Sequence, residues 1–398
     1  MRTHTMRGIV AAAALTVVAL GVAGCGSTTD EGTDEPDSGT ATDLVYPDET
    51  GACAADPLEG VDYDTASALI AEFEEKSTSL PVTEPLPEPV DPATTVAYLD
   101  NGSAVAGIIW AGLEQAAATA GVQLQRVDTG LDAQSINTAV STVVENAPDI
   151  LIAAAVDATF FQSQLEALEA AGTTVVYAGS SNAEQFGLLD SHSGYGASLV
   201  NGEVLAAAAI TFTCGTGTDF VFYSIPELSF SQVQLDAATA YLEETCEECT
   251  LRVVEIPVTT MDTTAGDAII SDLQANPDTD FFITPADQMQ IGLKGKMDLA
   301  GIDVHGMGQS SLPPNIEQIA SGLQAAGYAV DYNQYTWFML DEGLRRHQGL
   351  DVAYDDWVPW VKAISRVLTK ETAGEYPDGI FVAYPGMQED FAALWGKG

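Results

Sequence analysis

Hydrophobic and polar positions follow two alternating patterns from residue 94 to the end of the chain. Short apolar runs, such as 149–157 (DILIAAAVD) and 173–179 (TTVVYAG), have the length and composition of buried strands. Between them apolar residues recur every three or four positions, as in 106–117, which indicates helices with one buried face. Further strands are expected at 94–100, 122–128, 219–225, 251–258, 280–284, 302–307, 327–330 and 379–384. This alternation predicts an α/β fold whose parallel sheets are covered by helices.

The length of this region predicts more than one folded unit. About 300 residues follow position 94, and a single hydrophobic core rarely organises so long a chain. We therefore expect two doubly wound parallel-sheet lobes. In such sheets ligands bind beyond the carboxyl ends of the strands, where helix N-termini and loop side chains meet.

The first 57 residues have a different composition. Arg2 and Arg7 precede an apolar run at 8–22, which is shorter than the roughly 20 residues that span a bilayer and is typical of a signal peptide. Residues 26–57 carry nine acidic residues and no basic one, a composition that predicts a disordered tether. We divide this end into a signal peptide (1–24), an acidic tether (25–57) and an N-terminal extension (58–93).

The end of the apolar run resembles the lipobox of bacterial lipoproteins. Val22-Ala23-Gly24-Cys25 has an aliphatic residue, two small residues and a cysteine in that order. The resemblance implies cleavage before Cys25 and lipidation of its sulfur and amine, which would anchor the chain at the outer face of the cytoplasmic membrane. The alternatives are an uncleaved membrane helix and an ordinary secretory peptide.

The charge of the chain excludes one class of partner. Lys and Arg number 13 against 58 Asp and Glu, which gives a formal net charge of −45. Nucleic-acid binding needs basic residues that contact phosphates, so nucleic acid is not expected as a partner.

Four cysteines remain once Cys25 is lipidated: Cys53, Cys214, Cys246 and Cys249. An even number in an exported protein favours two disulfides. Cys246 and Cys249 have redox-motif spacing, but they follow a predicted helix instead of opening one, where the helix would activate a thiol. We expect them to pair with each other, and Cys53 with Cys214; free thiols, a metal and redox chemistry are the alternatives. The histidines show no paired spacing, and no metal site is expected.

The loops after the predicted strands carry hydroxyl, amide, carboxylate and aromatic side chains, and they contain no Lys or Arg. A phosphate or dicarboxylate ligand would ordinarily be held by Arg. Carboxylates and amides beside aromatic rings suit a neutral polyhydroxyl ligand. The candidate contacts from these loops are Asn101, Phe160, Ser181, Glu227 and Phe230.

From about residue 94 the chain resembles the type I periplasmic binding proteins, nearest the ribose-binding-like sugar branch. The resemblance lies in the succession of several stretches, among them VAYLD…GLEQAAATAG, DILIAAAVD…ALEAAGTTVVYAG and TDFFITPADQMQIGLKGKMDLAGIDVHGMGQ. It implies two lobes joined by a three-crossing hinge, with crossings near 181–183, near 309–311 and near the C-terminus. Lobe one would then comprise 94–183 and 310–370, and lobe two 184–309 and 371–398.

The resemblance also implies further ligand contacts. Asp157 matches an acceptor of sugar hydroxyls, Asp287 the acid of an Asn-Asp-(Glu/Gln)-Met-Ala-type segment, Gln309 a hinge-side polar contact and Thr263 a position that often bears an amide. The chain departs from the sugar binders in lacking aromatic residues after the first strand and an arginine after Asp157. Asp157 and Asp287 have an alternative role as helix caps, and Phe230 as a packing residue at a helix start.

These observations favour a binding protein over an enzyme. The sequence has no Gly-x-Ser-x-Gly motif, no phosphate-cradling glycine loop after the first strand and a signal peptide where a repressor has its DNA-binding domain. No cofactor is expected. We expect a monomeric, lipid-anchored solute-binding protein that delivers a small neutral, sugar-like ligand to an ABC-transporter permease. The alternatives are a sensor that presents its ligand to a membrane receptor, and a binder of a nucleoside or amino acid.

Overall fold

The computed structural model describes residues 44–48 and 50–397. The expected signal peptide, Cys25 and the tether up to residue 43 lie outside the described residues. Among the helices of the described part, none combines the length and the apolar character that crossing a membrane requires.

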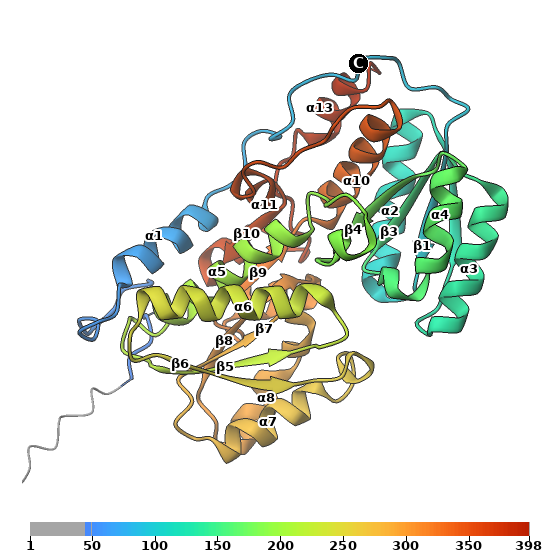
Figure 1. Cartoon of the computed structure of the whole chain (residues 1–398). Coiled ribbons are helices and arrows are strands. Elements are labelled where there is room, and N and C mark those ends of the chain that lie inside the picture. The colour runs from blue at the N-terminus through green and yellow to red at the C-terminus, as the bar shows by residue number, and fades with distance from the viewer. Residues whose placement is uncertain (1–43, 49, 398) are drawn as a thin grey trace, which may run out of the picture. The chain divides into compact units, whose positions relative to one another are not determined.

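Two sheets organise the described residues (Figure 1). The first lobe contains a parallel sheet with strand order β2-β1-β3-β4, and the second lobe a sheet with order β10-β9-β8-β7-β5-β6, parallel except for β10. This confirms the expected α/β class with two lobes. The strands are β1 Thr95–Asp100, β2 Gln123–Asp128, β3 Ile150–Ala154, β4 Thr174–Ala178, β5 Asp219–Ser224, β6 Thr250–Glu255, β7 Phe281–Thr284, β8 His305–Ser311, β9 Gly327–Val330 and β10 Ser365–Leu368.

Helices cover both faces of each sheet. They are α1 Tyr63–Glu74, α2 Ala104–Ala120, α3 Ala133–Asn146, α4 Gln162–Ala170, α5 Tyr195–Thr211, α6 Ser229–Thr245, α7 Ala265–Ala275, α8 Leu293–Ala300, α9 Pro313–Ser321, α10 Tyr332–His347, α11 Val358–Ile364, α12 Lys370–Ala373 and α13 Met387–Leu394.

Successive strand residues point to opposite layers of helices. In the first lobe Tyr98 packs with α2, α10 and α13, whereas Leu99 packs with α3 and α4. In the second lobe Phe222 packs with α1, α5 and α6, whereas Tyr223 packs with α7 and α8. Burial on both faces explains why central strands such as β3 and β7 read as continuous apolar runs instead of alternating ones.

Local signals set several helix ends where the sequence predicts them. Asp132 accepts hydrogen bonds from the backbone N–H groups of Gln134 and Ser135 and so caps α3. Gly121 ends α2 with φ of 76°, a left-handed conformation that glycine adopts without steric cost.

Two segments differ from the predicted strands. Residues 379–384 form irregular chain in which Ile380 is 57% exposed, and the edge strand is instead β10, where the sequence predicts none. Ser365–Leu368 is too short to show a periodic pattern of hydrophobic residues, so the sequence does not identify it as a strand. The apolar run at 379–384 is not a strand, because a strand also needs a neighbouring strand to which its backbone can hydrogen-bond.

The lobe boundaries also differ from those implied by the resemblance. Strands β8, β9 and β10 all belong to the second-lobe sheet, so residues 310–330 and 365–368 are not part of lobe one. Helices α10 and α13 pack in the first-lobe core, whereas α11 packs against α5 of the second lobe. The chain therefore passes between the lobes after β4, after β9, after α10 and after α12. The second crossing therefore falls at Asp331 instead of 309–311.

The described part of the expected tether is bound to the second lobe. The backbone N–H of Val45 donates to Thr216 Oγ1 at 2.9 Å, and the Tyr46 ring stacks on His305 at 3.8 Å. A disulfide joins Cys53 to Cys214, and a second joins Cys246 to Cys249 directly after α6, which confirms both expected pairings.

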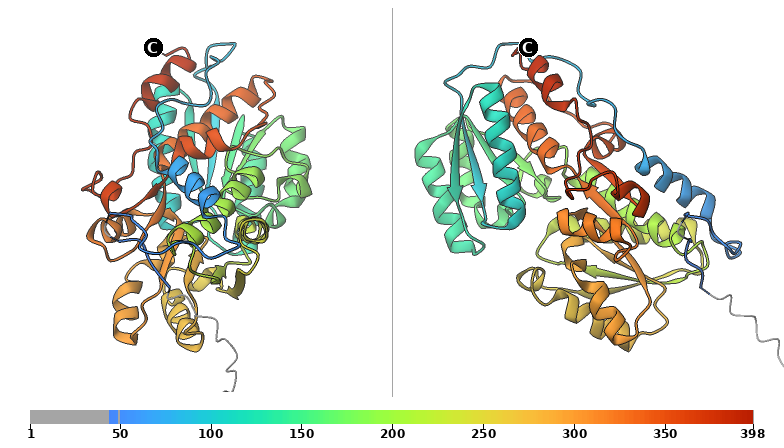
Figure 2. Two further views of the ribbon diagram at one scale, coloured as in Figure 1. Left: turned by 90° about the vertical axis from the view of Figure 1, so that its left-hand side faces the viewer. Right: turned by 180° about the vertical axis from the view of Figure 1, so that it is seen from behind.

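The N-terminal extension contacts both lobes. Helix α1 packs on α5 of the second lobe. The following segment runs past α13 before it enters β1 (Figure 2), and the backbone N–H of Leu86 donates to the carbonyl of Leu394 at 2.8 Å.

Candidate functional site

The carboxyl ends of the first-lobe strands bring Asp157 and the first crossing together. One carboxylate oxygen of Asp157 accepts the backbone N–H of Thr159 at 2.8 Å, and the other accepts the Asn182 amide at 3.1 Å. Asn182 in turn accepts the Tyr177 hydroxyl at 2.7 Å. Asp157 therefore caps the short helix after β3. Because it is only half-buried, its carboxylate can also accept a hydrogen bond from a further donor.

Other first-lobe candidates have structural partners. Asn101 Oδ1 accepts the backbone N–H of Ser103 at 3.0 Å and so shapes the turn into α2. Phe160 is 38% exposed, whereas its neighbour Phe161 is fully buried in the core. Ser181 lies on the first crossing: its N–H donates to Ser229 Oγ at 2.9 Å, and its hydroxyl contacts that of Ser198 at 2.7 Å.

Asp287, which the resemblance implies as a ligand contact, is buried among protein partners in this structure. Its side chain is 0% exposed, and its carboxylate accepts hydrogen bonds from the Ser311 hydroxyl and the Gln324 amide. Burial raises the pKa of Asp287 to about 7, although both hydrogen bonds lower it. It does not cap the 3₁₀ helix that it opens, since the preceding Ala286 holds the capping position and no side-chain cap is present.

The remaining second-lobe candidates lie at the same edge of the sheet. Gln309 accepts the Gln234 amide at 2.7 Å, while Gln234 Oε1 is buried without a hydrogen-bond partner. Glu227 is exposed and accepts the backbone N–H of Val258 at 3.3 Å. Phe230 is half-buried in the first turn of α6.

A pocket of about 420 Å³ is lined by both lobes. The first lobe contributes Ala104 and Ile108 from α2, and the second contributes the loops after β6, β7 and β8. Of the predicted contacts, only Thr263 lines it. The other lining residues are Met261, Asp262, Gly266, Gln288, Met289, Ile291, Leu293, Lys296, Leu312, Pro313 and Pro314.

The sequence predicts the loops of this pocket but not its composition. Met261, Gln288 and Leu312 lie in the strand-to-helix loops that the doubly wound pattern singles out. Ile108 lies on α2 beside the buried stripe that includes Ala106, Ile109 and Leu113, and its position one step off that stripe was the signal in the sequence.

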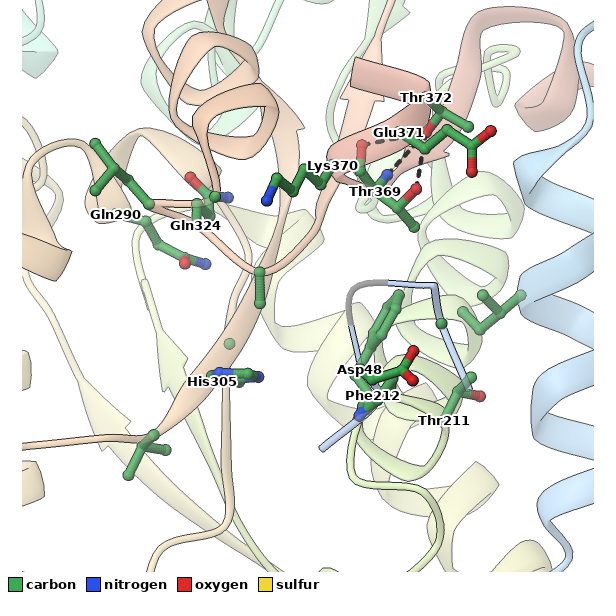
Figure 3. A pocket seen from close by; sticks show the side chains of 18 of the residues that line it. Asp48, Thr211, Phe212, Gln290, His305, Gln324, Thr369, Lys370, Glu371 and Thr372 are labelled. Carbon is green, nitrogen blue, oxygen red and sulfur yellow. Dashed lines mark hydrogen bonds between the residues drawn. The ribbon is translucent and has the colours of Figure 1, made fainter. Parts of the chain in front are cut away.

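A larger cavity, of about 600 Å³, lies elsewhere on the second lobe (Figure 3). Its walls come from residues 47, 48, 50 and 51, from α1, from the start of β8 and from the segment 369–372. Asp48, His305, Gln290, Gln324 and Lys370 line it. Its lining includes His305 and Gly306 at the amino end of β8, whereas this fold binds ligands beyond the carboxyl ends of its strands.

A buried polar cluster, which no sequence motif predicts, joins the segment after β4, helix α10 and the segment after α10. Glu342 of α10 accepts hydrogen bonds from the Ser191 hydroxyl at 3.0 Å and the Tyr354 hydroxyl at 2.7 Å, and pairs with His192 at 3.3 Å and Arg346 at 3.0 Å. Burial raises the pKa of Glu342, but these hydrogen bonds and charges outweigh it and hold the pKa below its usual value. The cluster holds these three segments together.

The described residues contain no group of three or more His, Cys, Asp or Glu side chains placed to hold a metal ion. The polar groups at the strand ends are hydroxyls, amides and carboxylates, which can bind a neutral ligand by hydrogen bonding.

The sequence profile described as "Periplasmic binding protein domain" matches residues 95–343. Among solved structures, the chain is similar to an ABC transporter periplasmic solute binding protein from Actinobacillus succinogenes with bound D-allose. The two share 16% identity with a TM-score of 0.58, over 71% of this chain and 100% of that chain.

Two further structures show the same likeness. A solute binding protein from Mycobacterium smegmatis with bound glycerol is 19% identical, with a TM-score of 0.59, over 71% of this chain and 96% of that chain. One from Burkholderia graminis in complex with D-arabinose is 12% identical, with a TM-score of 0.59, over 71% and 97%. At these identities the likeness shows the fold alone. No curated protein sequence matches the chain.

Proposed function

Because the chain belongs to the periplasmic binding protein family, with a type I fold, we propose that it is a solute-binding lipoprotein. It captures a small neutral, sugar-like ligand between its lobes and delivers this ligand to an ABC-transporter permease. The observation that carries the proposal is the pocket lined by both lobes. Such a site is completed when the lobes close over the ligand, so binding and the closed state favour each other. Bound D-allose, glycerol and D-arabinose in structures of the same fold support a polyhydroxyl ligand.

The test of this function is ligand identification followed by titration. Mass spectrometry of the purified chain identifies what co-purifies, and a thermal-shift screen of sugars, polyols, nucleosides and amino acids ranks the classes. A ligand that binds only the folded state raises the melting temperature by mass action. The sugar assignment would be contradicted if amino acids or nucleosides raise the melting temperature and sugars and polyols do not.

Asp157→Ala should weaken binding of the identified ligand ten- to a hundredfold. A hydrogen bond to a charged acceptor contributes about 1.5–3 kcal/mol, which equals that change in affinity. Isothermal titration calorimetry measures it. The matched control is Asp132→Ala, because Asp132 also caps a helix of the first lobe but is not among the predicted ligand contacts. Both variants should lose about 1 kcal/mol of stability, because each loses a helix cap. If Asp157→Ala binds the ligand as tightly as Asp132→Ala does, Asp157 serves only as a helix cap.

Cys25→Ala should release the protein from the membrane. We infer anchoring from the Val22-Ala23-Gly24-Cys25 sequence, since a thioether-linked lipid needs the cysteine sulfur. Detergent phase partitioning of the expressed protein measures the effect, with Ser27→Ala as the control that keeps Cys25. Partitioning of Cys25→Ala into detergent as complete as that of the parent would overturn the lipoprotein assignment.

A further inference from the structure

The pocket between the lobes is mainly aliphatic. Its walls contain isoleucine, leucine, methionine, alanine and proline, and none of its lining residues is aromatic or an arginine. The sequence predicts aromatic rings beside the ligand, but Phe160 and Phe230 do not line this pocket. A ligand group that enters here therefore meets saturated carbon and sulfur on most sides.

The few polar side chains of the pocket are largely engaged with protein partners. Gln288 Nε2 donates to Asp262 Oδ1 at 3.0 Å, and Lys296 forms an ion pair of 2.6 Å with Asp267. The Thr263 hydroxyl donates to the carbonyl of Thr260 at 3.3 Å. A polyhydroxyl group buried here would lose its water without finding equivalent partners, which is unfavourable.

Two large aliphatic side chains on different lobes stay in solvent at this pocket. Ile108 on α2 is 37% exposed, and Ile291 after β7 is 43% exposed. Both would gain by being covered, because removal of apolar surface from water is favourable in proportion to its area. An aliphatic ligand group that contacts both walls would be covered from each lobe.

We propose that the ligand is amphiphilic: a neutral glycoside or polyol ether that places an aliphatic substituent in this pocket. The inference rests on the proposed binding function and specifies the ligand class for the same site. The hydroxyl-bearing part is left for the polar groups at the first-lobe strand ends, such as Asp157.

The test is a chain-length series of neutral glycosides on the mature full-length protein. Calorimetric titration compares D-glucose with methyl, butyl and hexyl β-D-glucosides, and repeats the series with galactose and arabinose as the sugar. We expect affinity to rise about fourfold for each added methylene, the equivalent of about 0.8 kcal/mol, until the pocket is filled.

The outcomes separate this inference from the proposed function. Tight binding of free sugars with no gain from the alkyl chain overturns the amphiphilic ligand and leaves sugar binding in place. Failure of every free sugar and every alkyl glycoside to bind overturns both.

Substitutions in the pocket locate the effect. Ile108→Ser and Ile291→Ser should flatten the dependence on chain length, so that hexyl and methyl glucosides differ less than in the parent. The matched control is Leu299→Ser, because Leu299 is 92% exposed on α8 and does not line the pocket. All three positions are exposed, so the variants should have melting temperatures close to that of the parent. If affinity depends on alkyl-chain length in both isoleucine variants as it does in the parent, the aliphatic group binds elsewhere and the proposed site is wrong.

Discussion

Replacing Cys53 and Cys214 together with alanine should lower the free energy of unfolding by about 5 kcal/mol and the melting temperature by about 7 °C. The bond closes a loop with a sequence separation of 161, and cross-linking so long a loop strongly reduces the conformational entropy of the unfolded chain. Urea unfolding and calorimetric melting of the parent and the double variant measure the loss. Alanine is the suitable replacement at Cys214 because that position is fully buried.

The second disulfide supplies a matched control. Cys246 and Cys249 are separated by only 3 positions, so the same relation gives a loss of about 2 kcal/mol for their double alanine variant. Equal losses for the two pairs would show that loop closure does not explain the stabilisation. The longer bond also holds the segment around Val45 and Tyr46 on the second lobe, so proteolysis before residue 58 should become faster only in the Cys53 and Cys214 variant.

Asp287→Asn should remove a large pH dependence of stability. Burial raises the folded-state pKa of Asp287 to about 7, above its ordinary value of 3.8. Between these values the folded state binds a proton that the unfolded state does not, so the contribution of Asp287 is fully present below about pH 4 and is lost as the pH rises through 7. The difference amounts to about 4 kcal/mol.

Asparagine resembles the protonated side chain and can keep the hydrogen bonds to Ser311 and Gln324. We therefore expect the stability of Asp287→Asn relative to the parent to improve by about 4 kcal/mol between pH 4 and pH 8, measured by urea unfolding. Asp298→Asn is the control, because that carboxylate is 56% exposed on α8. A constant difference between Asp287→Asn and the parent would mean that Asp287 is ionised throughout this range. Unchanged ligand affinity in Asp287→Asn would support its structural role.

The local pattern of the sequence was sufficient for most of the secondary structure. The run at 149–157 contains β3, Gly121 ends α2 and Asp132 caps α3, because strand burial, left-handed turns and capping each depend on neighbouring residues. The even number of cysteines and the position of Cys246 at a helix end favoured the two disulfides that the structure contains, but they left other cysteine chemistry open. The same pattern predicted the α/β class and the strand-to-helix loops that line the pocket between the lobes.

Only the tertiary structure decided which of these residues are buried and which line a pocket. Asp157 and Asp287 look alike in the sequence, since each follows a buried strand, but Gln324 and Ser311 bury Asp287 from positions 37 and 24 residues away. Likewise Ile108 and Ile291 line one pocket although they belong to different lobes. Periodicity and capping are set by neighbours within a few residues, whereas burial and pocket composition are set by contacts between distant segments, which no local pattern specifies.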